Sequence, residues 1–249
     1  MTTPQRGRRL AFSDLHGRLD IFKKICNFIK PEDELYCLGD CGDRGPHSWE
    51  TIKAVLTHPQ VVTYLKGNHE DMLVKAYLNN KKYDMNTDDY YLLCYNGGAD
   101  TYMGLMMEQE MAMSWVSKLK TLPTIASIMN ENGKLVIMSH AGYTPGSEIP
   151  SPEDIIWNRD HFYEPWPEGF DDTVMVHGHT PISYLKKDGI IKFQKGVGDI
   201  LAYDDGHKID IDTGAVHTGV AVLLNLDTFE IHRIYGDEWA YLHDSEEDK

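Results

Sequence analysis

The sequence predicts an α/β protein in which parallel strands alternate with helices. Three observations support this class. Short apolar strands alternate with amphipathic helices along the first 75 residues, and a polar cluster follows each of these strands. The composition, 41% hydrophobic and 25% charged over 249 residues, is that of a folded protein with a core. We expect one domain at residues 1–235, because no linker-like segment divides the chain, and an acidic, frayed tail at residues 236–249.

The first half begins with three successive pairs of a strand and a helix. The expected pairs are 8–12 with 19–29, 35–38 with 49–56, and 61–65 with 70–78. Connections between parallel strands are right-handed, and the carboxyl ends of such strands meet at one edge of the sheet, where ligands bind. The polar clusters at residues 13–17, 39–45 and 67–70 should therefore lie close together.

Residues 81–122 have a helical pattern that is rich in Met and Tyr. The expected core contacts are Leu105, Met106, Trp115, Val116 and Leu119. Methionine is flexible and commonly fills gaps in a core, so we expect the methionines of this region to be packed inside.

The second half is rich in strands. Asn132-Gly133 predicts a hairpin between strands at 124–129 and 134–139, and Asp205-Gly206 predicts another between 200–203 and 208–211. Residues 174–176 and 219–224 add further strands. Residues 147–172 contain prolines, aromatic residues and acids, and are expected to form a long irregular loop that could lie over the site.

The formal charge of −15 is concentrated in the second half of the chain. Residues 1–125 carry −1 and residues 126–249 carry −14. Such a surface repels phosphate backbones and anionic lipids, so nucleic acids and membranes are not expected partners. No apolar run is long enough for a membrane span or a secretory signal, and a cytoplasmic location is the expectation. The spacing of Cys26, Cys37, Cys41 and Cys94 fits neither a zinc ribbon nor a disulfide framework.

Six residues of the types that bind metals lie at five expected strand ends. They are Asp14, His16, Asp40, Asn68, His140 and His179. Carboxylate oxygen, imidazole and amide oxygen suit divalent metals, and a carboxylate such as Asp40 can bridge two ions. The sequence therefore predicts a two-metal site.

The motifs around these residues resemble a known family. Asp-x-His-Gly (14–17), Gly-Asp-x-x-Asp-Arg-Gly (39–45), Gly-Asn-His-Glu (67–70), Ser-His-Ala-Gly (139–142) and Gly-His-Thr (178–180) occur in this order. Together they resemble the calcineurin-like metallophosphoesterases, and the second and third motifs resemble the phosphoprotein phosphatase branch. Residues 96–98, 156–159, 178–181 and 211–216 are similar to segments of lambda-phage-type and bacterial serine/threonine phosphatases.

The resemblance implies a four-layer α-β-β-α sandwich with two mixed β-sheets and a dinuclear metal site at the strand ends. It assigns Asp14, His16 and Asp40 to one metal, and Asp40, Asn68, His140 and His179 to the other. Mn²⁺ is the expected metal, although the ligand set also suits Fe²⁺ or Zn²⁺. The resemblance further implies that Arg44 and Arg159 bind the phosphate group. His69, oriented by Asp43, would be the general acid in an in-line attack by a metal-bridging hydroxide.

Three functions fit these residues. The first is a serine/threonine protein phosphatase that acts on phosphorylated proteins or small phosphoesters. The alternative is a symmetrical dinucleoside tetraphosphate hydrolase, a related branch with nearly the same ligands. A scaffold with a vestigial site is disfavoured, because no ligand position is missing.

Several neighbouring residues carry weaker expectations. Glu70 should support the turn or cap the following helix, and His47, His58 and His161 are expected on the surface. The roles of His177 and His217 are left open. Cys41-Gly42 stands where phage-type members have two apolar residues, so we expect a less tightly packed loop and a Cys41 whose oxidation would impair metal binding.

Overall fold

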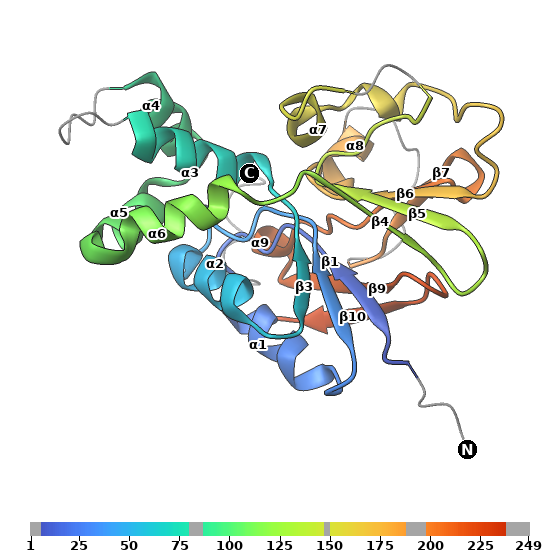
Figure 1. The fold of residues 1–249 in the computed structure, drawn as a ribbon, viewed down its shortest axis with the longest axis horizontal. Helices are drawn as coiled ribbons and strands as arrows, with labels where there is room; N and C mark the ends of the chain where they lie inside the picture. Colours follow the sequence, from blue (N-terminus) through green and yellow to red (C-terminus); the bar gives the residue numbers. More distant parts are fainter. Residues whose placement is uncertain (1–5, 80–86, 147–149, 188–197, 238–249) are drawn as a thin grey trace.

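Two five-stranded mixed sheets form the centre of the molecule. The structure is a computed structural model that describes residues 6–79, 87–146, 150–187 and 198–237 (Figure 1). The first sheet, in spatial order, contains β10 (Ile231–Tyr235), β9 (Val220–Asn225), β1 (Arg9–Phe12), β2 (Glu34–Cys37) and β3 (Val61–Tyr64). The second contains β4 (Ile125–Met129), β5 (Leu135–Ser139), β6 (Thr173–His177), β8 (Lys208–Asp210) and β7 (Leu201–Tyr203).

Helices flank the two sheets, so the layers run helix, sheet, sheet, helix (Figure 1). On the side of the first sheet lie α1 (Leu19–Phe28), α2 (Ser48–Thr57), α3 (Asn68–Asn79), α4 (Asp88–Tyr95), α5 (Ala99–Met107) and α6 (Gln109–Lys120). Beyond the second sheet lie α7 (Asp154–Trp157) and α8 (Ile182–Lys187). The remaining turns are α9 (Ala215–Thr218) and the 3-10 turns η1 (Asp160–Phe162) and η2 (Asp204–Gly206). This is the α/β class that the sequence predicts, with the layering that the family resemblance implies.

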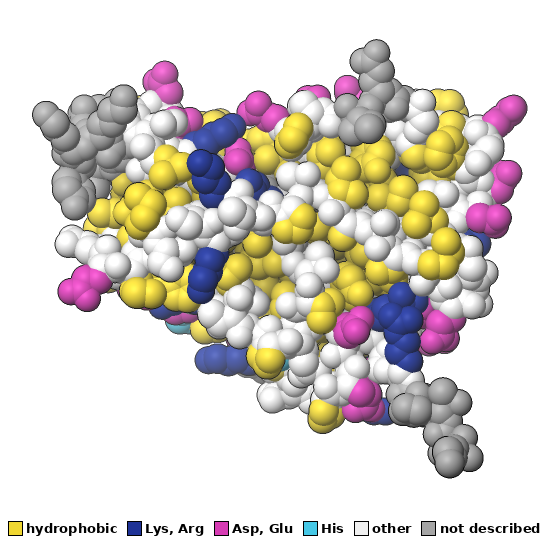
Figure 2. Space-filling view, in the orientation of Figure 1, with side chains coloured by type: hydrophobic (Ala, Val, Ile, Leu, Met, Phe, Trp, Pro, Cys, Tyr) yellow, Lys and Arg dark blue, Asp and Glu magenta, His cyan; other side chains and the backbone are white. Residues whose placement is uncertain are grey.

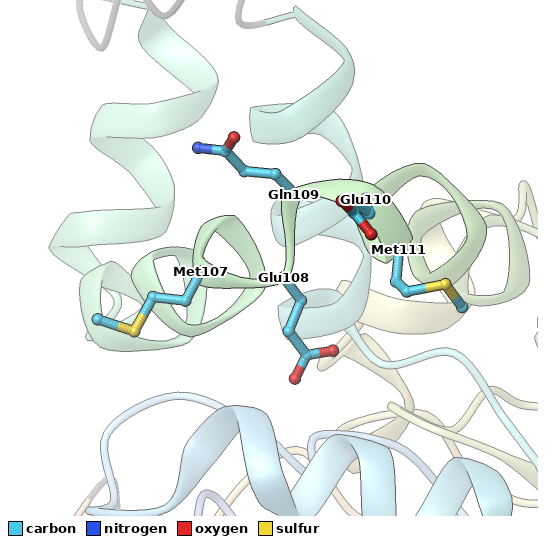
Figure 3. Close-up of a pocket in the computed structure, with 5 residues that line it drawn as sticks. All are labelled: Met107, Glu108, Gln109, Glu110 and Met111. Atoms are coloured by element: carbon cyan, nitrogen blue, oxygen red, sulfur yellow. The ribbon is translucent and has the colours of Figure 1, made fainter.

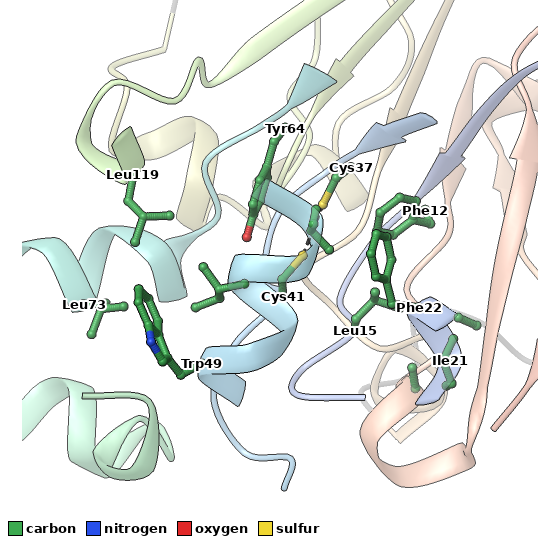
Figure 4. Packing of buried hydrophobic residues seen from close by; sticks show 14 of the residues in the cluster. Phe12, Leu15, Ile21, Phe22, Cys37, Cys41, Trp49, Tyr64, Leu73 and Leu119 are labelled. Atoms are coloured by element: carbon green, nitrogen blue, oxygen red, sulfur yellow. Dashed lines mark hydrogen bonds between the residues drawn. The ribbon is translucent and has the colours of Figure 1, made fainter. Parts of the chain in front are cut away.

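Alternation along β1 divides the core into two parts. Leu10 and Phe12 point toward the helices, whereas Ala11 packs between the two sheets. Because side chains of a strand alternate between faces, an uninterrupted apolar strand such as β1 must be covered on both sides. Figure 4 shows the helix-side part, in which Phe22 of α1 and Trp49 of α2 lie in the same cluster as Phe12.

The predicted strands and hairpins of the described residues are confirmed within one or two residues. β1, β2 and β3 pair in parallel, and β4 with β5 and β7 with β8 are antiparallel hairpins. Helix α3 begins at Asn68, two residues earlier than expected, so Asn68 and His69 lie in its first turn. The expected tail begins with Gly236, whose N–H donates to Gly219 O, and Asp237; residues 238–249 of that tail lie outside the described residues.

One strand was not predicted from the sequence. β10 pairs antiparallel with β9 along five residues. The turn between them lacks the Asn-Gly or Asp-Gly pair that marks the other hairpins, and Phe229 adopts a φ of 60° there. Asp227 in this turn is buried and paired with Arg9 of β1. A long-range ion pair thus secures a turn that carries no local signal.

The expectation that methionines fill the core of α5 and α6 was wrong for four of them. Met103, Met107, Met111 and Met113 are each between 45% and 85% exposed, whereas Met106 is partly buried against the core. Figure 2 shows apolar side chains on the surface over these helices. The turn between α5 and α6 lines a surface pocket of about 420 Å³, with Met107 and Met111 at its two sides (Figure 3). Trp115 and Leu119, two of the expected core contacts, pack there together with Trp49.

Residues 150–172 contain more structure than an irregular loop. They include α7 and η1, and Lys75 of α3 pairs with Glu153 just before α7 at 3.0 Å. Residues 147–149 of the expected loop lie outside the described residues.

None of the described helices has the length and apolar character that a membrane span requires.

Candidate metal centre and active site

The six predicted ligands are buried and meet at the carboxyl ends of the strands. They come from the turn after β1, the turn after β2, the first residue of α3, and the residues that follow β5 and β6. Their exposed fractions lie between 0% and 7%, and the residues are Asp14, His16, Asp40, Asn68, His140 and His179. Five separate segments of the chain thus converge on one place.

The turns after β1 and β2 are joined through their backbones. Asp14 N donates to Gly39 O at 3.1 Å and His16 N donates to Asp40 O at 3.0 Å. Asp14, His16 and Asp40 have φ values of 52°, 40° and 55°, a region that costs about 1–3 kcal/mol per residue outside glycine. His179 has a φ of 73°. Such strain is retained where the surrounding hydrogen bonds hold the backbone, and here it aims four candidate ligands inward.

Two overlapping groups of side chains could each hold a metal ion. His16, Asp40 and His69 form one, and Asp40, His140 and His179 form the other; within each group the ligand atoms lie within 4.8 Å of one another. Asp40 belongs to both, as the sequence predicts for a bridging residue.

The two remaining predicted ligands lie beside these groups. Asn68 Oδ1 is 3.0 Å from both His140 Nε2 and His179 Nδ1. Asp14 Oδ1 is 3.9 Å from His16 Nε2. The structure also brings His69 closer to Asp40 than expected for a residue outside the ligand set, with Nε2 3.8 Å from Oδ2.

Hydrogen bonds orient the imidazoles as metal binding requires. His16 Nδ1 donates to Gly42 O and His140 Nδ1 donates to Leu38 O, each at 2.8 Å. This leaves Nε2 of each ring to face the cluster, which is the usual arrangement of metal-binding histidines. Asp14 Oδ1 and His179 Nε2 are buried without a hydrogen-bond partner in the described part of the chain. The donor set therefore fits divalent metal ions.

Opposite charges within the cluster shift its pKa values. Burial alone would raise the pKa of Asp40, but His140 and His69 hold it well below its usual value. Burial would lower the pKa of His140, yet Asp40 raises it to about 10. Without metal, the opposite charges of Asp40 and His140 thus stabilise each other as an ion pair, with Oδ2 of Asp40 3.2 Å from Nε2 of His140.

Glu70 supports the turn that carries Asp40. It is fully buried, and its carboxylate accepts from the N–H groups of Asp40, Cys41 and Gly67, each at 2.9 Å, and from Tyr64 Oη at 2.8 Å. The expectation that Glu70 supports the turn is confirmed. Four donors on one carboxylate fix the position of the residue shared by both groups.

Two glycines allow the close approach of neighbouring chains. A Cβ on Gly67 would lie 2.0 Å from Asp40 Oδ1, and one on Gly178 would lie 2.1 Å from Asp14 Oδ2. Any side chain at these positions would displace a candidate ligand.

The proposed general acid is held by partners on both ring nitrogens. His69 Nδ1 is 2.6 Å from Asp43 Oδ2, and Arg44 Nη2 donates to His69 Nε2 at 2.8 Å. Arg44 Nη1 also donates to His16 Nε2 at 2.8 Å. Burial lowers the pKa of His69, but Asp40 and Asp43 outweigh it and the net shift is upward. Arg44, Asp43 and His69 are thus brought together as the motifs predict.

Thr101 of α5 is a site residue that sequence reasoning missed. Its hydroxyl donates to Asp43 Oδ1 and accepts from Asp43 N at 3.1 Å. Nearby, Arg44 N donates to Gly97 O at 2.9 Å. The motif at residues 96–98 was the available signal, because it lies in the segment that leads into α5 and contacts the Asp43 turn.

Arg159 lies on the segment that follows α7, at the edge of the centre. It is exposed, and together with burial and His140 its charge holds the pKa of His179 well below its usual value. The ring of Trp157 in the same segment is 6.1 Å from that of His179. The segment therefore lies beside the centre, as expected for residues 147–172.

Two further expectations were wrong. His161 is fully buried rather than on the surface, because its ring packs against His177 and Tyr203. The Cys41 turn is tightly packed: Cys41 is fully buried, and its sulfur lies 3.3 Å from that of Cys37 (Figure 4). Burial raises the pKa of Cys41 well above its usual value, so the structure favours an unreactive thiol.

The other histidines divide between surface and interior. His47 is exposed as expected, whereas His58 is half-buried against Phe22. His177 is fully buried, and His217 is exposed on α9.

Comparison with known proteins agrees with this geometry. Residues 7–209 match the family model described as calcineurin-like phosphoesterase. A curated protein of Vibrio parahaemolyticus serotype O3:K6 (strain RIMD 2210633), named symmetrical bis(5'-nucleosyl)-tetraphosphatase, is 24% identical over 232 residues, covering 80% of this chain and 79% of that protein.

Solved structures share the fold. A putative diadenosine tetraphosphatase superposes with a TM-score of 0.59 at 17% identity, covering 94% of this chain and 95% of that chain. A serine/threonine protein phosphatase of Saccharomyces cerevisiae superposes with a TM-score of 0.52 at 14% identity, covering 95% of this chain and 82% of that chain. With a family match over most of its length, the chain belongs to the calcineurin-like phosphoesterases.

Proposed function

We propose that this metal-dependent phosphoesterase is a symmetrical dinucleoside tetraphosphate hydrolase. The observation that supports this choice is the similarity to a curated symmetrical tetraphosphatase, which extends over about four-fifths of both chains. From the sequence alone, this activity ranks second, after a serine/threonine protein phosphatase. The comparisons favour the tetraphosphatase, because the structural likeness to protein phosphatases shows the fold alone.

In the proposed site, Asp14, His16 and Asp40 would hold one divalent ion. Asp40, Asn68, His140 and His179 would hold the second. When bound, the ions would supply Lewis-acid activation of water and neutralise charge on the phosphate group. Glu70 and the joined turns after β1 and β2 keep Asp40 in place for both ions.

Residues of the chain would bind the phosphate and supply the proton. Arg44 and Arg159 would each direct planar N–H groups to phosphate oxygens. Movement of Arg44 onto the substrate would free His69 Nε2, which the guanidinium contacts at 2.8 Å. Once Arg44 has left it and Nε2 has taken up a proton, His69 would donate this proton to the leaving oxygen as the P–O bond breaks. Asp43, itself held by Thr101, would hold the ring through Nδ1.

A substrate panel tests the choice. With Mn²⁺, kcat/KM should be more than about tenfold higher for diadenosine tetraphosphate than for p-nitrophenyl phosphate or a phosphoserine peptide, with ADP as the nucleotide product. Asp40→Asn, purified in parallel, should be inactive on all three and excludes a contaminant. A preference for the phosphopeptide would contradict the proposal and support the protein phosphatase, which the motifs at residues 156–159 and 211–216 favour.

A further inference from the structure

A chain of buried hydrogen bonds joins two segments of the candidate site. Tyr203 Oη, at the end of β7, lies 2.8 Å from His161 Nδ1 and 2.9 Å from His177 Nε2. His161 follows Arg159 by two residues, and His177 precedes His179 by two. One hydroxyl thus bridges the segment of the proposed phosphate-binding arginine and the turn of a proposed metal ligand.

The three side chains hydrogen-bond in one consistent direction. His177 Nδ1 donates to Gly178 O at 3.1 Å, so its Nε2 accepts from the Tyr203 hydroxyl. The Tyr203 oxygen in turn accepts from His161 Nδ1. Each ring needs only one N–H for this pattern, which is the neutral form of imidazole.

Lys208 of β8 holds the same segment by its backbone. It is fully buried, and Nζ donates to His161 O at 2.6 Å and Glu164 O at 2.7 Å. Nζ also lies 2.7 Å from Asp204 Oδ2, so three acceptors surround one ammonium group. A buried lysine is costly unless its protons are satisfied, and here the three acceptors satisfy them. As a consequence, residues 161–164 are fixed to the second sheet.

We propose that Tyr203, through His161 and His177, is a positioning residue that sets Arg159 relative to His179 and so determines the affinity for the phosphate group. The inference rests on the proposed roles of Arg159 and His179, but not on which phosphoester is the natural substrate. The backbone of Arg159 anchors its side chain, so a shift of residues 159–161 shifts the region that the guanidinium can reach. The hydroxyl of Tyr203 adds two hydrogen bonds between this segment and the turn of His179, beside the direct packing of the His161 and His177 rings.

Tyr203→Phe removes this hydroxyl while the ring can keep its stacking on Phe162, where the centroids lie 5.4 Å apart. We expect the dissociation constant of inorganic phosphate for the Mn²⁺-loaded protein, measured by calorimetry, to rise about fivefold, because both hydrogen bonds of the hydroxyl are lost and only part of that loss reaches the phosphate site. KM for p-nitrophenyl phosphate should rise similarly, with kcat within about twofold.

Tyr36→Phe is the matched control, because its hydroxyl contacts Glu34 on β2 at 3.2 Å. It should leave both constants unchanged. A Tyr203→Phe protein that melts at a lower temperature but binds phosphate normally would overturn the inference.

A double-mutant cycle tests whether Tyr203 acts through Arg159. Arg159→Ala alone should weaken phosphate binding, and adding Tyr203→Phe should then have no further effect. An unchanged fivefold effect of Tyr203→Phe in the Arg159→Ala protein would overturn the inference. Normal phosphate affinity in Arg159→Ala would refute the role of Arg159 and this inference together, without affecting the substrate proposal. If the double-mutant cycle gives the expected result but diadenosine tetraphosphate is turned over poorly, only the substrate proposal would be refuted.

Discussion

His69 contacts Asp43 through Nδ1 and Arg44 through Nε2, and its role can be tested by the choice of leaving group. His69→Asn should lower kcat for an alkyl phosphate by about 10²–10⁴, because an alkoxide needs a proton to leave. The loss for p-nitrophenyl phosphate should be much smaller, since nitrophenolate leaves without one. Steady-state kinetics on both esters provide the measurement.

The half-buried His58 offers a control for this change. It follows the C-terminal end of α2 and packs against Phe22, and His58→Asn should alter neither rate. Full turnover of the alkyl ester by His69→Asn would show that His69 is not the general acid.

Glu70 is the residue whose loss should most disturb the centre without removing a proposed ligand. Glu70→Gln places an amide among three backbone N–H groups and a tyrosine hydroxyl, and one buried donor left without an acceptor costs about 1–3 kcal/mol. We expect the free energy of unfolding in urea to fall by at least that amount, and Mn²⁺ affinity to fall with it.

Tyr64→Phe distinguishes the contribution of the tyrosine hydroxyl from that of the backbone N–H groups that donate to Glu70. It removes only one of the four hydrogen bonds to Glu70 and should cost about 1 kcal/mol. Equal stability of Glu70→Gln and the parent protein would show that the Asp40 turn is held by other contacts.

Helix α1 is tied at its first turn to two distant elements. Arg18 donates to Asp20 through Nε and Nη2 and to Ala215 O, where α9 begins, through Nη1. Asp20 Oδ2 also accepts from Asp237 N, just past β10. The link therefore joins the start of the first helix to the end of the first sheet.

These contacts make the stability of the protein depend on pH. Burial would raise the pKa of Asp20, but Arg18 and the N–H of Asp237 lower it from 3.8 to about 2. A depressed pKa contributes stability at pH values above 3.8, which is lost as the pH falls through about 2; the shift corresponds to on the order of 2 kcal/mol. Urea unfolding of Asp20→Asn at pH 7 should show a loss of this size.

The difference between Asp20→Asn and the parent should shrink between pH 4 and pH 2. A difference that stays constant over this range would mean that the carboxylate charge is not the source of the stabilisation.

At the level of elements, the sequence predicted those strands and turns that are determined by residues close together in the chain. The short apolar runs of β1, β2 and β3 and the Asn-Gly and Asp-Gly turns were sufficient to place most strands. β10 was missed because its turn depends on Asp227 and Arg9, which are distant in sequence. The exposure of four methionines of α5 and α6 was missed because the core beneath these helices is formed by other residues, such as Trp49, Trp115 and Leu119.

At the scale of the whole molecule, the net charge of −15 affects the approach of charged substrates. A polyanionic dinucleotide is repelled by this charge, and salt screens the repulsion. We expect kcat/KM for diadenosine tetraphosphate to rise several-fold between about 10 mM and 150 mM ionic strength. Among phosphopeptides, those with basic flanks should be turned over faster than acidic ones at low salt.

A neutral-salt series with two peptides of equal length checks this expectation. Faster turnover of the acid-flanked peptide at low salt would mean that local positive charge, such as that of Arg44 and Arg159, outweighs the charge of the whole protein.

The sequence by itself determined the α/β class, the six candidate ligands and the family resemblance, because these depend on local periodicity and on short motifs at strand ends. Only the tertiary structure revealed that Thr101 holds Asp43, that Glu70 collects four donors, and that Tyr203 joins the segments of Arg159 and His179. These contacts span up to 58 residues of sequence and form only when two sheets and their helices pack together. Short-range patterns carry no record of such pairings, since each partner alone is an ordinary threonine, glutamate or tyrosine.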